Sequence, residues 1–439
     1  MKKEELKQKV LRSIEDNQEQ IVALGTLIYH EPELGFKETK TAEKVEKIFR
    51  AMGISYEKGL AITGVKGRLK GKQSKKTVAL LGELDAVICA GHPDANPLNG
   101  AAHCCGHNTQ IAVLAAVGQA LLETGAMQFL SGDVVLFAVP AEEYVEISYR
   151  NTLRKEGKIK YLGGKQELIY LGAFDDIDMA LQIHLLTATE GQSSFVRLGS
   201  TSNGFIGKLV HYRGKAAHAA MAPSEGINAL NAAMLGVMGV NAQRETFREE
   251  DCVRFHPIIT QGGDLVNVVP EDVRIESYVR AASMEALDSS NRKIDRALRA
   301  GADAVGAEVS IQSLPGYLPM NNNPALNAVF KKNAEAIYGK TQVVEGTHEA
   351  GSTDTGDLSH IMPTIHPWLG CVSGALHSKE YTVTDVHAAY VKSAQALAMT
   401  VIDLLYGEAE VAGEIINGYA PLLTKEQYLH FQDSINREK

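Results

Sequence analysis

The chain has 439 residues, a length that favours two domains over a single core. Hydrophobic residues make up 45% of it and charged residues 22%, which is the composition of a globular protein. Its net charge of −9 argues against nucleic-acid and anionic-membrane partners, which need clustered lysine and arginine. Neither an apolar signal segment after Met1 nor a membrane-spanning apolar run of about 18 residues is visible, so we expect a cytoplasmic protein.

The first part of the chain alternates between helix-like and strand-like patterns. Apolar residues recur every three or four positions in the segments expected to form helices: 4–29, 38–52 and 107–123. Short apolar runs typical of buried strands stand at 77–81, 133–139 and 179–184. This alternation indicates an α/β domain with a largely parallel sheet, in which functional residues gather at the carboxyl ends of strands.

A different order appears in the middle of the chain. We expect strand, helix, strand, strand, helix and strand over 205–213, 225–243, 251–261, 268–280, 283–304 and 307–313. This βαββαβ order is that of a ferredoxin-like unit. Because the α/β pattern resumes after Pro319, we predict a lid domain at 198–315, inserted between the two parts of a catalytic domain at 1–197 and 316–439.

A candidate metal site begins where Cys105 and His107 stand two positions apart at a predicted strand-to-helix turn. A thiolate and an imidazole suit zinc and similar divalent metals. The alternative is a histidine at the start of a helix beside an unrelated core cysteine. The five cysteines of the chain are odd in number and scattered, and we expect them to be free thiols.

Two carboxylates, Glu142 and Glu143, follow the apolar run at 133–139. Burying both of them without a cation would be costly, so their position favours a metal site over a surface acidic pair. His184 ends another apolar run, and His377 lies in a polar segment. Each histidine alone is ambiguous, because a hydrogen-bonded structural histidine is the commoner case.

The order of these motifs resembles that of the aminoacylase-type metallopeptidase family. Within it, the chain is similar to the amidohydrolase branch of hippurate, indoleacetyl-amino-acid and aminobenzoyl-glutamate hydrolases. The resemblance spans nearly the whole chain, through His30–Gly35, Thr41-Ala42, Gly82–Ala86, Cys105–His107, Pro140–Glu143, Gly214–Ala220, Gly262–Pro270, Gly351–Asp354 and Leu376–Ser378. Asn108 and the Ser-Thr-Asp segment at 352–354 resemble the aminobenzoyl-glutamate hydrolase type most.

The resemblance implies an α/β fold: a zinc-peptidase-like catalytic domain with a mostly parallel central sheet, and an inserted ferredoxin-like α+β lid that mediates dimerisation. It also implies two divalent metal ions, zinc or manganese, with cobalt as a third candidate. The implied metal ligands, with Cys105 bridging, are Cys105, His107, Glu143, His184 and His377.

Roles for other residues follow from the same resemblance. Glu142 matches the general base, because one carboxylate of the pair binds metal while its neighbour stays free to take a proton. His218 in the lid matches a histidine that stabilises the oxyanion, in many relatives from a partner subunit. Asn267 and Arg280 match positions that hold the carboxylate of the substrate. Asp85 matches a residue that orients a ligand from behind.

The resemblance therefore implies hydrolysis of the amide bond in an N-acyl amino acid or dipeptide-like substrate with a free carboxylate, by a protein that forms a homodimer through the lid. A cysteine-nucleophile amidase that uses Cys104 or Cys105 is a second hypothesis. A non-catalytic or partner-dependent subunit is a third. The segment 86–102 is longer than the connection in relatives, and it is either a solvated loop or a determinant of substrate choice.

Overall fold

The computed structural model describes residues 1–188 and 194–438 and forms two compact units. The first unit consists of Met1–Thr201, Asn321–Thr347 and Asp357–Thr424. The second consists of Ser202–Met320, His348–Gly356 and Lys425–Lys439. The predicted boundaries at 197/198 and 315/316 stay predictions; the second unit also takes in two segments that lie later in the chain. No helix of the described residues is long and apolar enough to cross a membrane.

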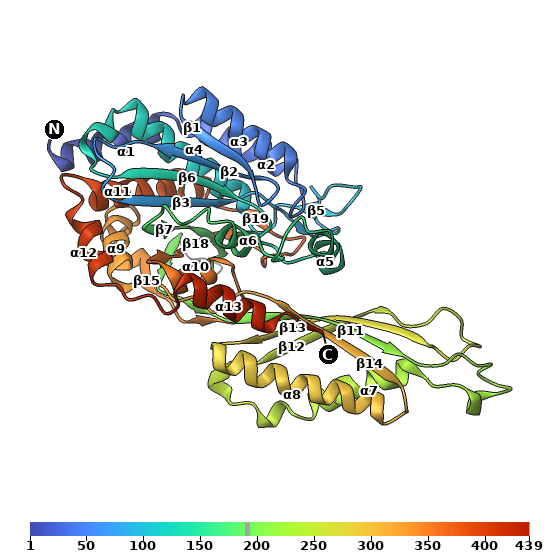
Figure 1. The fold of residues 1–439 in the computed structure, drawn as a ribbon. Helices are drawn as coiled ribbons and strands as arrows, with labels where there is room; N and C mark the ends of the chain where they lie inside the picture. The colour runs from blue at the N-terminus through green and yellow to red at the C-terminus, as the bar shows by residue number, and fades with distance from the viewer. Residues whose placement is uncertain (189–193, 439) are drawn as a thin grey trace. The chain divides into compact units, whose positions relative to one another are not determined.

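The first unit is built on a six-stranded sheet of order β1-β2-β6-β3-β7-β17 (Figure 1). Its strands are β1 (Ser55–Leu60), β2 (Gly64–Leu69), β6 (Asp133–Val139), β3 (Thr77–Glu83), β7 (Met179–Leu181) and β17 (Thr364–Ile365). β3 pairs in parallel with β6 and β7, and β7 pairs in parallel with β17. Every residue of β3 and β6 is buried, as the unbroken apolar runs of a sheet covered on both faces require.

Helices cover this sheet. α4 (His107–Glu123) packs on β3 and β6, and α3 (Thr39–Ala51) packs on β1 and β2. The helices that pack on α4 include α1 (Lys3–Asp16), α2 (Gln18–Tyr29) and α11 (Ser393–Leu405). The remaining helices of this part of the chain are α5 (Ile147–Lys155), α6 (Gly164–Tyr170), α9 (Pro324–Tyr338), α10 (Thr355–Ile361) and α12 (Glu410–Asn417).

A second, mixed sheet of the first unit has the order β15-β9-β18-β19, with β8 paired to β18. Its strands are β15 (Val343–Glu345), β9 (Phe195–Leu198), β18 (Trp368–Ser373), β19 (Thr382–Val383) and β8 (His184–Thr187). Two short strands, β4 (Val87–Ile88) and β5 (Ala101–Ala102), close the long segment 86–102 as a hairpin.

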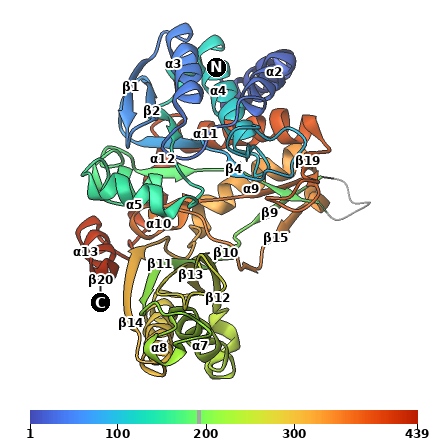
Figure 2. The same cartoon turned by 90° about the vertical axis from the view of Figure 1, so that its right-hand side faces the viewer.

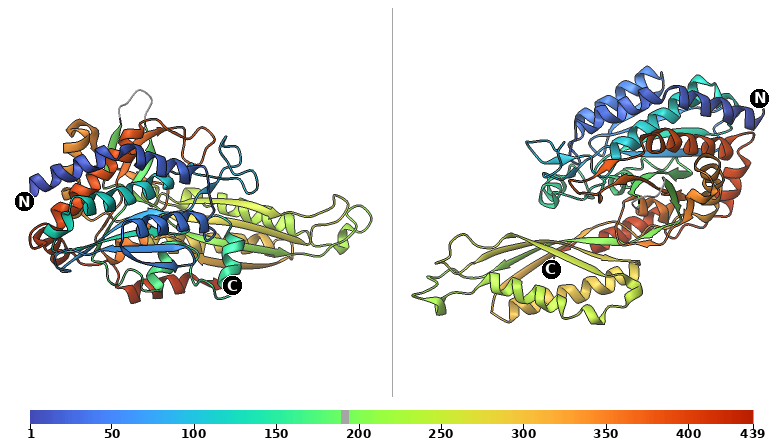
Figure 3. Two further views of the ribbon diagram at one scale, coloured as in Figure 1. Left: turned by 90° about the horizontal axis from the view of Figure 1, so that it is seen from above. Right: turned by 180° about the vertical axis from the view of Figure 1, so that it is seen from behind.

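The second unit is an antiparallel sheet of order β12-β13-β11-β14-β20. Its strands are β11 (Gly204–Arg213), β12 (Arg254–Gln261), β13 (Asp272–Ala281), β14 (Glu308–Pro315) and β20 (Arg437–Glu438). The helices α7 (Ala229–Asn241) and α8 (Met284–Asp303) pack on each other and lie on one face of the sheet (Figures 2 and 3). The predicted βαββαβ order and the ferredoxin-like fold are thereby confirmed. The other α-helix and strands are α13 (Lys425–Ile435), β10 (Thr201–Ser202) and β16 (His348–Glu349), and a π-helix at His387–Lys392 precedes α11.

The helix predicted over 4–29 is two helices, which meet at Asn17. The Asn17 backbone N–H and side-chain amide both donate to the carbonyl of Ser13, at 3.2 and 2.9 Å. A side chain that bonds to a backbone carbonyl in this way favours the end of a helix. The spacing of apolar residues does not predict such an end, because it does not depend on polar side chains.

The strand predicted over 179–184 is likewise divided, into β7 and β8. β7 belongs to the central sheet, whereas β8 pairs with β18 in the second sheet. The segment that pairs with these two strands also passes from one sheet to the other: β17 pairs with β7 in the central sheet, and β18 pairs with β8 in the second sheet. His184 therefore begins a strand instead of ending one.

Candidate metal centre

The turn that carries Cys105 and His107 depends on the glycine between them. Gly106 has a φ of +87°, and a Cβ at this position would lie 2.7 Å from the Tyr381 hydroxyl. A larger residue would therefore be both strained and obstructed. His107 follows as the first residue of α4 and, like Cys105, is buried.

Cys105 lies between two histidines. Its Sγ is 3.3 Å from His184 Nε2 and 3.2 Å from His377 Nε2. His377 Nε2 is in turn 2.9 Å from Glu143 Oε1. Potential ligand atoms lie within 4.8 Å of one another in two groups that share Cys105, namely Cys105, His107 and His184, and Cys105, Glu143 and His377. The structure thus brings the five predicted ligands together. Four are buried, and the side chain of His377 is 47% exposed.

Backbone carbonyls hold the imidazole rings of His107 and His184 through the Nδ1 atom of each ring. His107 Nδ1 lies 2.9 Å from the carbonyl of Asp85, and His184 Nδ1 lies 2.7 Å from the carbonyl of Leu185. A carbonyl only accepts, so in both rings Nδ1 carries a proton and donates, and in the neutral ring Nε2 offers its lone pair. The Asp85 carboxylate accepts from the backbone N–H of Glu143 at 2.8 Å, so Asp85 supports two of the five residues.

The donor atoms fit a divalent cation. His107 Nε2 and Glu143 Oε1 are buried and have no hydrogen-bond partner among the described residues. Glu143 Oε1 is 2.9 Å from His377 Nε2, yet the two atoms are not aligned as donor and acceptor. Buried polar atoms without a partner are costly, and a cation bound by both would remove that cost. Thiolate, imidazole and carboxylate together are the ligand set of zinc and related metals.

The charges of the site favour a cation as well. Burial and the Glu143 carboxylate raise the pKa of the Cys105 thiol, but His184 and His377 outweigh them and lower it to about 6. Burial also raises the pKa of Glu143, whereas the charge of His377 lowers it to about 2. Both groups are therefore negative at neutral pH, which is the form that binds metal.

Glu142 is buried and follows Ala141, whose φ is +54°. Sequence analysis did not identify the residue that holds this backbone, Arg150. The guanidinium of Arg150 donates to the carbonyls of Ala141 at 3.0 Å and Leu162 at 2.7 Å, and also to that of Glu143. Arg150 lies in a polar segment with no recognised motif, so nothing in the sequence pointed to it.

Glu38 supports the same segment and was also missed. It is fully buried and accepts from the Ala141 N–H at 2.8 Å and from the Thr63 hydroxyl at 2.7 Å. Burial, and then the negative charge of Asp85, raise the pKa of Glu38 to about 7.

Glu83 is a third residue that sequence analysis passed over. It ends β3, and its Oε2 lies 2.9 Å from His107 Nε2. Its donor atoms form a further close group with those of His107 and Glu142. A signal was available, because Glu83 stands two positions before Asp85 at the end of a buried strand.

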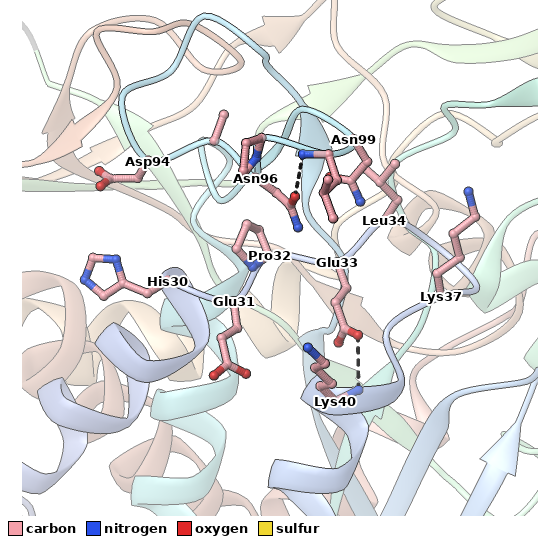
Figure 4. Close-up of a pocket in the computed structure, with 13 residues that line it drawn as sticks. His30, Glu31, Pro32, Glu33, Leu34, Lys37, Lys40, Asp94, Asn96 and Asn99 are labelled. Atoms are coloured by element: carbon pink, nitrogen blue, oxygen red, sulfur yellow. Dashed lines mark hydrogen bonds between the residues drawn. The ribbon is translucent and has the colours of Figure 1, made fainter.

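The long segment 86–102 borders a cavity of about 510 Å³ on the first unit (Figure 4). The cavity lies between residues 94–99 and the segment that begins with His30, Glu31 and Pro32. His92 of the long segment is buried and bonds to the Tyr381 carbonyl and to the Asp94 N–H. Both ring nitrogens of His92 are therefore used structurally.

The predicted residues of the second unit lie at two different ends of its sheet. His218 and Asn267 are exposed and sit on neighbouring segments, with the Ala219 N–H 2.9 Å from the Asn267 carbonyl. These segments extend past the first residue of β13, whereas Arg280 stands near its last. At about 3.3 Å per residue, the strand separates them by roughly 26 Å. Within the second unit of one chain, Arg280 therefore lies far from His218 and Asn267.

Arg280 is itself fixed. Its guanidinium donates to the Ser352 hydroxyl at 2.7 Å and to His256 Nε2 at 3.1 Å. Ser352 belongs to the small polar segment that sequence analysis singled out. Through Ser352, this segment holds the guanidinium of Arg280 in place.

Comparison with known proteins identifies the family. The chain belongs to peptidase family M20/M25/M40, whose profile matches residues 79–403. The Xaa-Arg dipeptidase of Mus musculus is 29% identical over 449 residues, covering 97% of this chain and 94% of that protein. The IAA-amino acid hydrolase ILR1-like 4 of Arabidopsis thaliana is 25% identical over 398 residues, covering 87% and 85%. A dinuclear metal-binding M20 peptidase from Bacillus subtilis has a similar fold, with a TM-score of 0.65, 20% identity and coverage of 89% and 99%.

These matches confirm the amidohydrolase-type resemblance and the fold class. The chain is a metallo-hydrolase that acts on amides.

Proposed function

We propose that this metallo-hydrolase cleaves the amide bond of a dipeptide-like substrate or an N-acyl amino acid with a free carboxylate. The observation that carries the proposal is the convergence of Cys105, His107, Glu143, His184 and His377 beside the buried carboxylate of Glu142. The two relatives support the substrate class, since the names Xaa-Arg dipeptidase and IAA-amino acid hydrolase both describe an amide formed by the nitrogen of an amino acid.

In this proposal the chain holds two divalent metal ions, zinc or manganese. Cys105, His107 and His184 would hold one ion, and Cys105, Glu143 and His377 the other. When bound, the metals polarise the scissile carbonyl and acidify the attacking water.

The side chains of the protein supply the proton transfers. Glu142 takes a proton from the attacking water and returns it to the leaving amine. Arg150 and Glu38 hold the backbone on either side of this base, which keeps the carboxylate in position. His218 would stabilise the oxyanion, and Asn267 and Arg280 would bind the substrate carboxylate.

We further propose a cytoplasmic homodimer that associates through the second unit. His218 and Asn267 lie at the opposite end of β13 from Arg280, so one chain does not offer all three to a single substrate. In a dimer, one copy would supply His218 and Asn267 to a substrate and the other copy would supply Arg280.

Family membership favours the metal mechanism over a cysteine nucleophile, but Cys105 is ionised at neutral pH and lies next to two histidines, so the test must separate the two roles of this thiol. The first experiment is hydrolysis of Xaa-Arg dipeptides and aminobenzoyl-glutamate, with and without a chelator. Loss of activity with the chelator and recovery on adding Zn²⁺ or Mn²⁺ supports the metal mechanism. Activity that is unchanged by the chelator but abolished by Cys105→Ser supports a mechanism in which the Cys105 thiolate is the nucleophile.

A further inference from the structure

We propose that Glu83 is an additional carboxylate ligand of the metal centre, held ready by Lys165, Gln110 and Gln182. The proposal deepens the metal site on which the proposed function rests. It assigns a place to a buried charge that the mechanism above does not use.

The first observation is the geometry at His107. Nδ1 of its ring donates to the Asp85 carbonyl, so Nε2 is the nitrogen that would be available to a metal. Glu83 Oε2 lies 2.9 Å from this nitrogen, yet Nε2 has no aligned hydrogen-bond partner among the described residues. The two atoms therefore lie side by side and do not form a donor–acceptor pair.

That spacing matches the spacing of ligands around one ion. Two donors that each lie about 2.1 Å from a metal are roughly 3.0–3.4 Å apart in octahedral or tetrahedral geometry. The other close pairs of the site lie at 2.9, 3.2 and 3.3 Å. At 2.9 Å, the pair formed by Glu83 and His107 is as close as the pair formed by Glu143 and His377 and lies just below the ideal spacing.

The second observation is how Glu83 is held. Its Oε1 accepts from Lys165 Nζ at 2.7 Å and from Gln182 Nε2 at 2.6 Å. Among the described residues, its Oε2 accepts a hydrogen bond only from Gln110 Nε2, at 2.8 Å. A carboxylate oxygen has two lone pairs, so Oε2 keeps one on the side of His107.

The third observation is charge. Glu83, Lys165, Gln110 and Gln182 are all buried. Lys165 Nζ lies 2.7 Å from Glu83 Oε1, so these two groups form a buried ion pair. A buried ammonium beside this carboxylate offsets the cost of placing a further negative group near Cys105 and Glu143. Lys165 thus makes an extra anionic ligand tolerable.

The test compares Glu83→Gln with Glu167→Gln in the full-length protein. Glu167 is also buried, lies on α6 with Lys165, and bonds only to backbone N–H groups of residues 160 and 161 among the described residues. Each variant is loaded with Zn²⁺ or Co²⁺ alone. The readouts are the metal stoichiometry, the Kd from competition with a chromophoric chelator, and the visible absorption of the Co²⁺ form.

We expect Glu83→Gln to weaken one of two metal equivalents at least tenfold and to shift the Co²⁺ bands, while Glu167→Gln leaves both unchanged. Wild-type affinity in Glu83→Gln would overturn the proposal. A weaker Kd with unchanged Co²⁺ bands would also overturn it, since Glu83 would then act only through His107.

Glu83→Asp covers the case in which Glu83→Gln does not fold. It keeps the charge opposite Lys165 but withdraws the carboxylate by one methylene, and it should shift the Co²⁺ bands as well. If the wild-type chain binds no metal, the proposed function falls together with this inference. If the wild type binds two equivalents and Glu83→Asp behaves like it, only the inference falls.

Discussion

The candidate metal centre of the first unit and the residues proposed to bind substrate in the second are built in opposite ways. The donors of the centre come from segments far apart in the chain, yet they meet within a few ångströms and most of them are buried. His218, Asn267 and Arg280 are exposed or half-exposed, and one strand length separates Arg280 from the others. One chain thus brings together all the proposed metal ligands, whereas it separates the three residues proposed to bind the substrate.

The largest effect is expected at Glu142. Glu142→Gln keeps the size of the side chain but removes the base, so kcat should fall by about 10²–10⁴-fold. Metal content should stay near that of the wild type, because Glu143 remains. Elemental analysis alongside initial rates checks both points. Substantial turnover by the variant would show that another group takes the proton.

A mixing experiment tests the contrast between the two regions directly. Glu142→Gln and His218→Ala should each be nearly inactive, but subunits exchanged between them should recover activity. The reason is that a hybrid dimer contains one site with an intact base and an intact His218. Rates measured before and after exchange check this prediction. No recovery, with exchange verified by mass spectrometry, would place both residues in the site of the same chain.

Arg280→Lys should have a smaller effect. The lysine keeps the charge but loses the planar fork that binds a carboxylate in two places, so KM should rise about tenfold while kcat changes little. Substrates whose carboxylate is amidated should no longer distinguish the variant from the wild type. A change confined to kcat would contradict a carboxylate-binding role.

Metal retention should depend on pH through Cys105. The thiol titrates with a pKa of about 6 in the metal-free site, so protons compete with the metal as the pH falls through this value. Metal affinity should accordingly drop several-fold between pH 7 and pH 5, as measured by release to a chelator. An affinity that stays constant over this interval would argue against a thiolate ligand.

The smallest effect concerns stability through Glu38. Its pKa is raised from 4.5 to about 7, so the folded protein binds more protons than the unfolded chain between these values. Stability contributed at this position therefore falls as pH rises from about 4.5 to 7, by on the order of 1–3 kcal/mol. Glu38→Gln should remove this slope in denaturant titrations, and an unchanged slope would assign it to other groups.

The sequence predicted most of what is encoded by local pattern. The parallel strands β3 and β6, the helix that begins at His107 and the βαββαβ order of the second unit all follow from apolar periodicity. The break at Asn17 was missed because one side chain causes it. The step from β7 to β8 was missed because it depends on which sheet each partner strand joins.

Prediction of the site residues was limited in the same way, to those that a local pattern marks. Cys105, His107, Glu142 and Glu143 stand at strand or helix ends, where the pattern itself draws attention to them. Arg150 and Lys165 act through contacts with carbonyls and a carboxylate that lie far away in the chain or in an irregular segment. No spacing rule in a single sequence reveals such partners.

The metal content of the purified protein, measured together with chelator-sensitive hydrolysis of an Xaa-Arg dipeptide, tests the proposed metal mechanism most directly. We expect close to two equivalents of divalent metal and activity that disappears with the chelator and returns with Zn²⁺ or Mn²⁺. Metal-free protein whose amidase activity is indifferent to chelator and to added metal would contradict it.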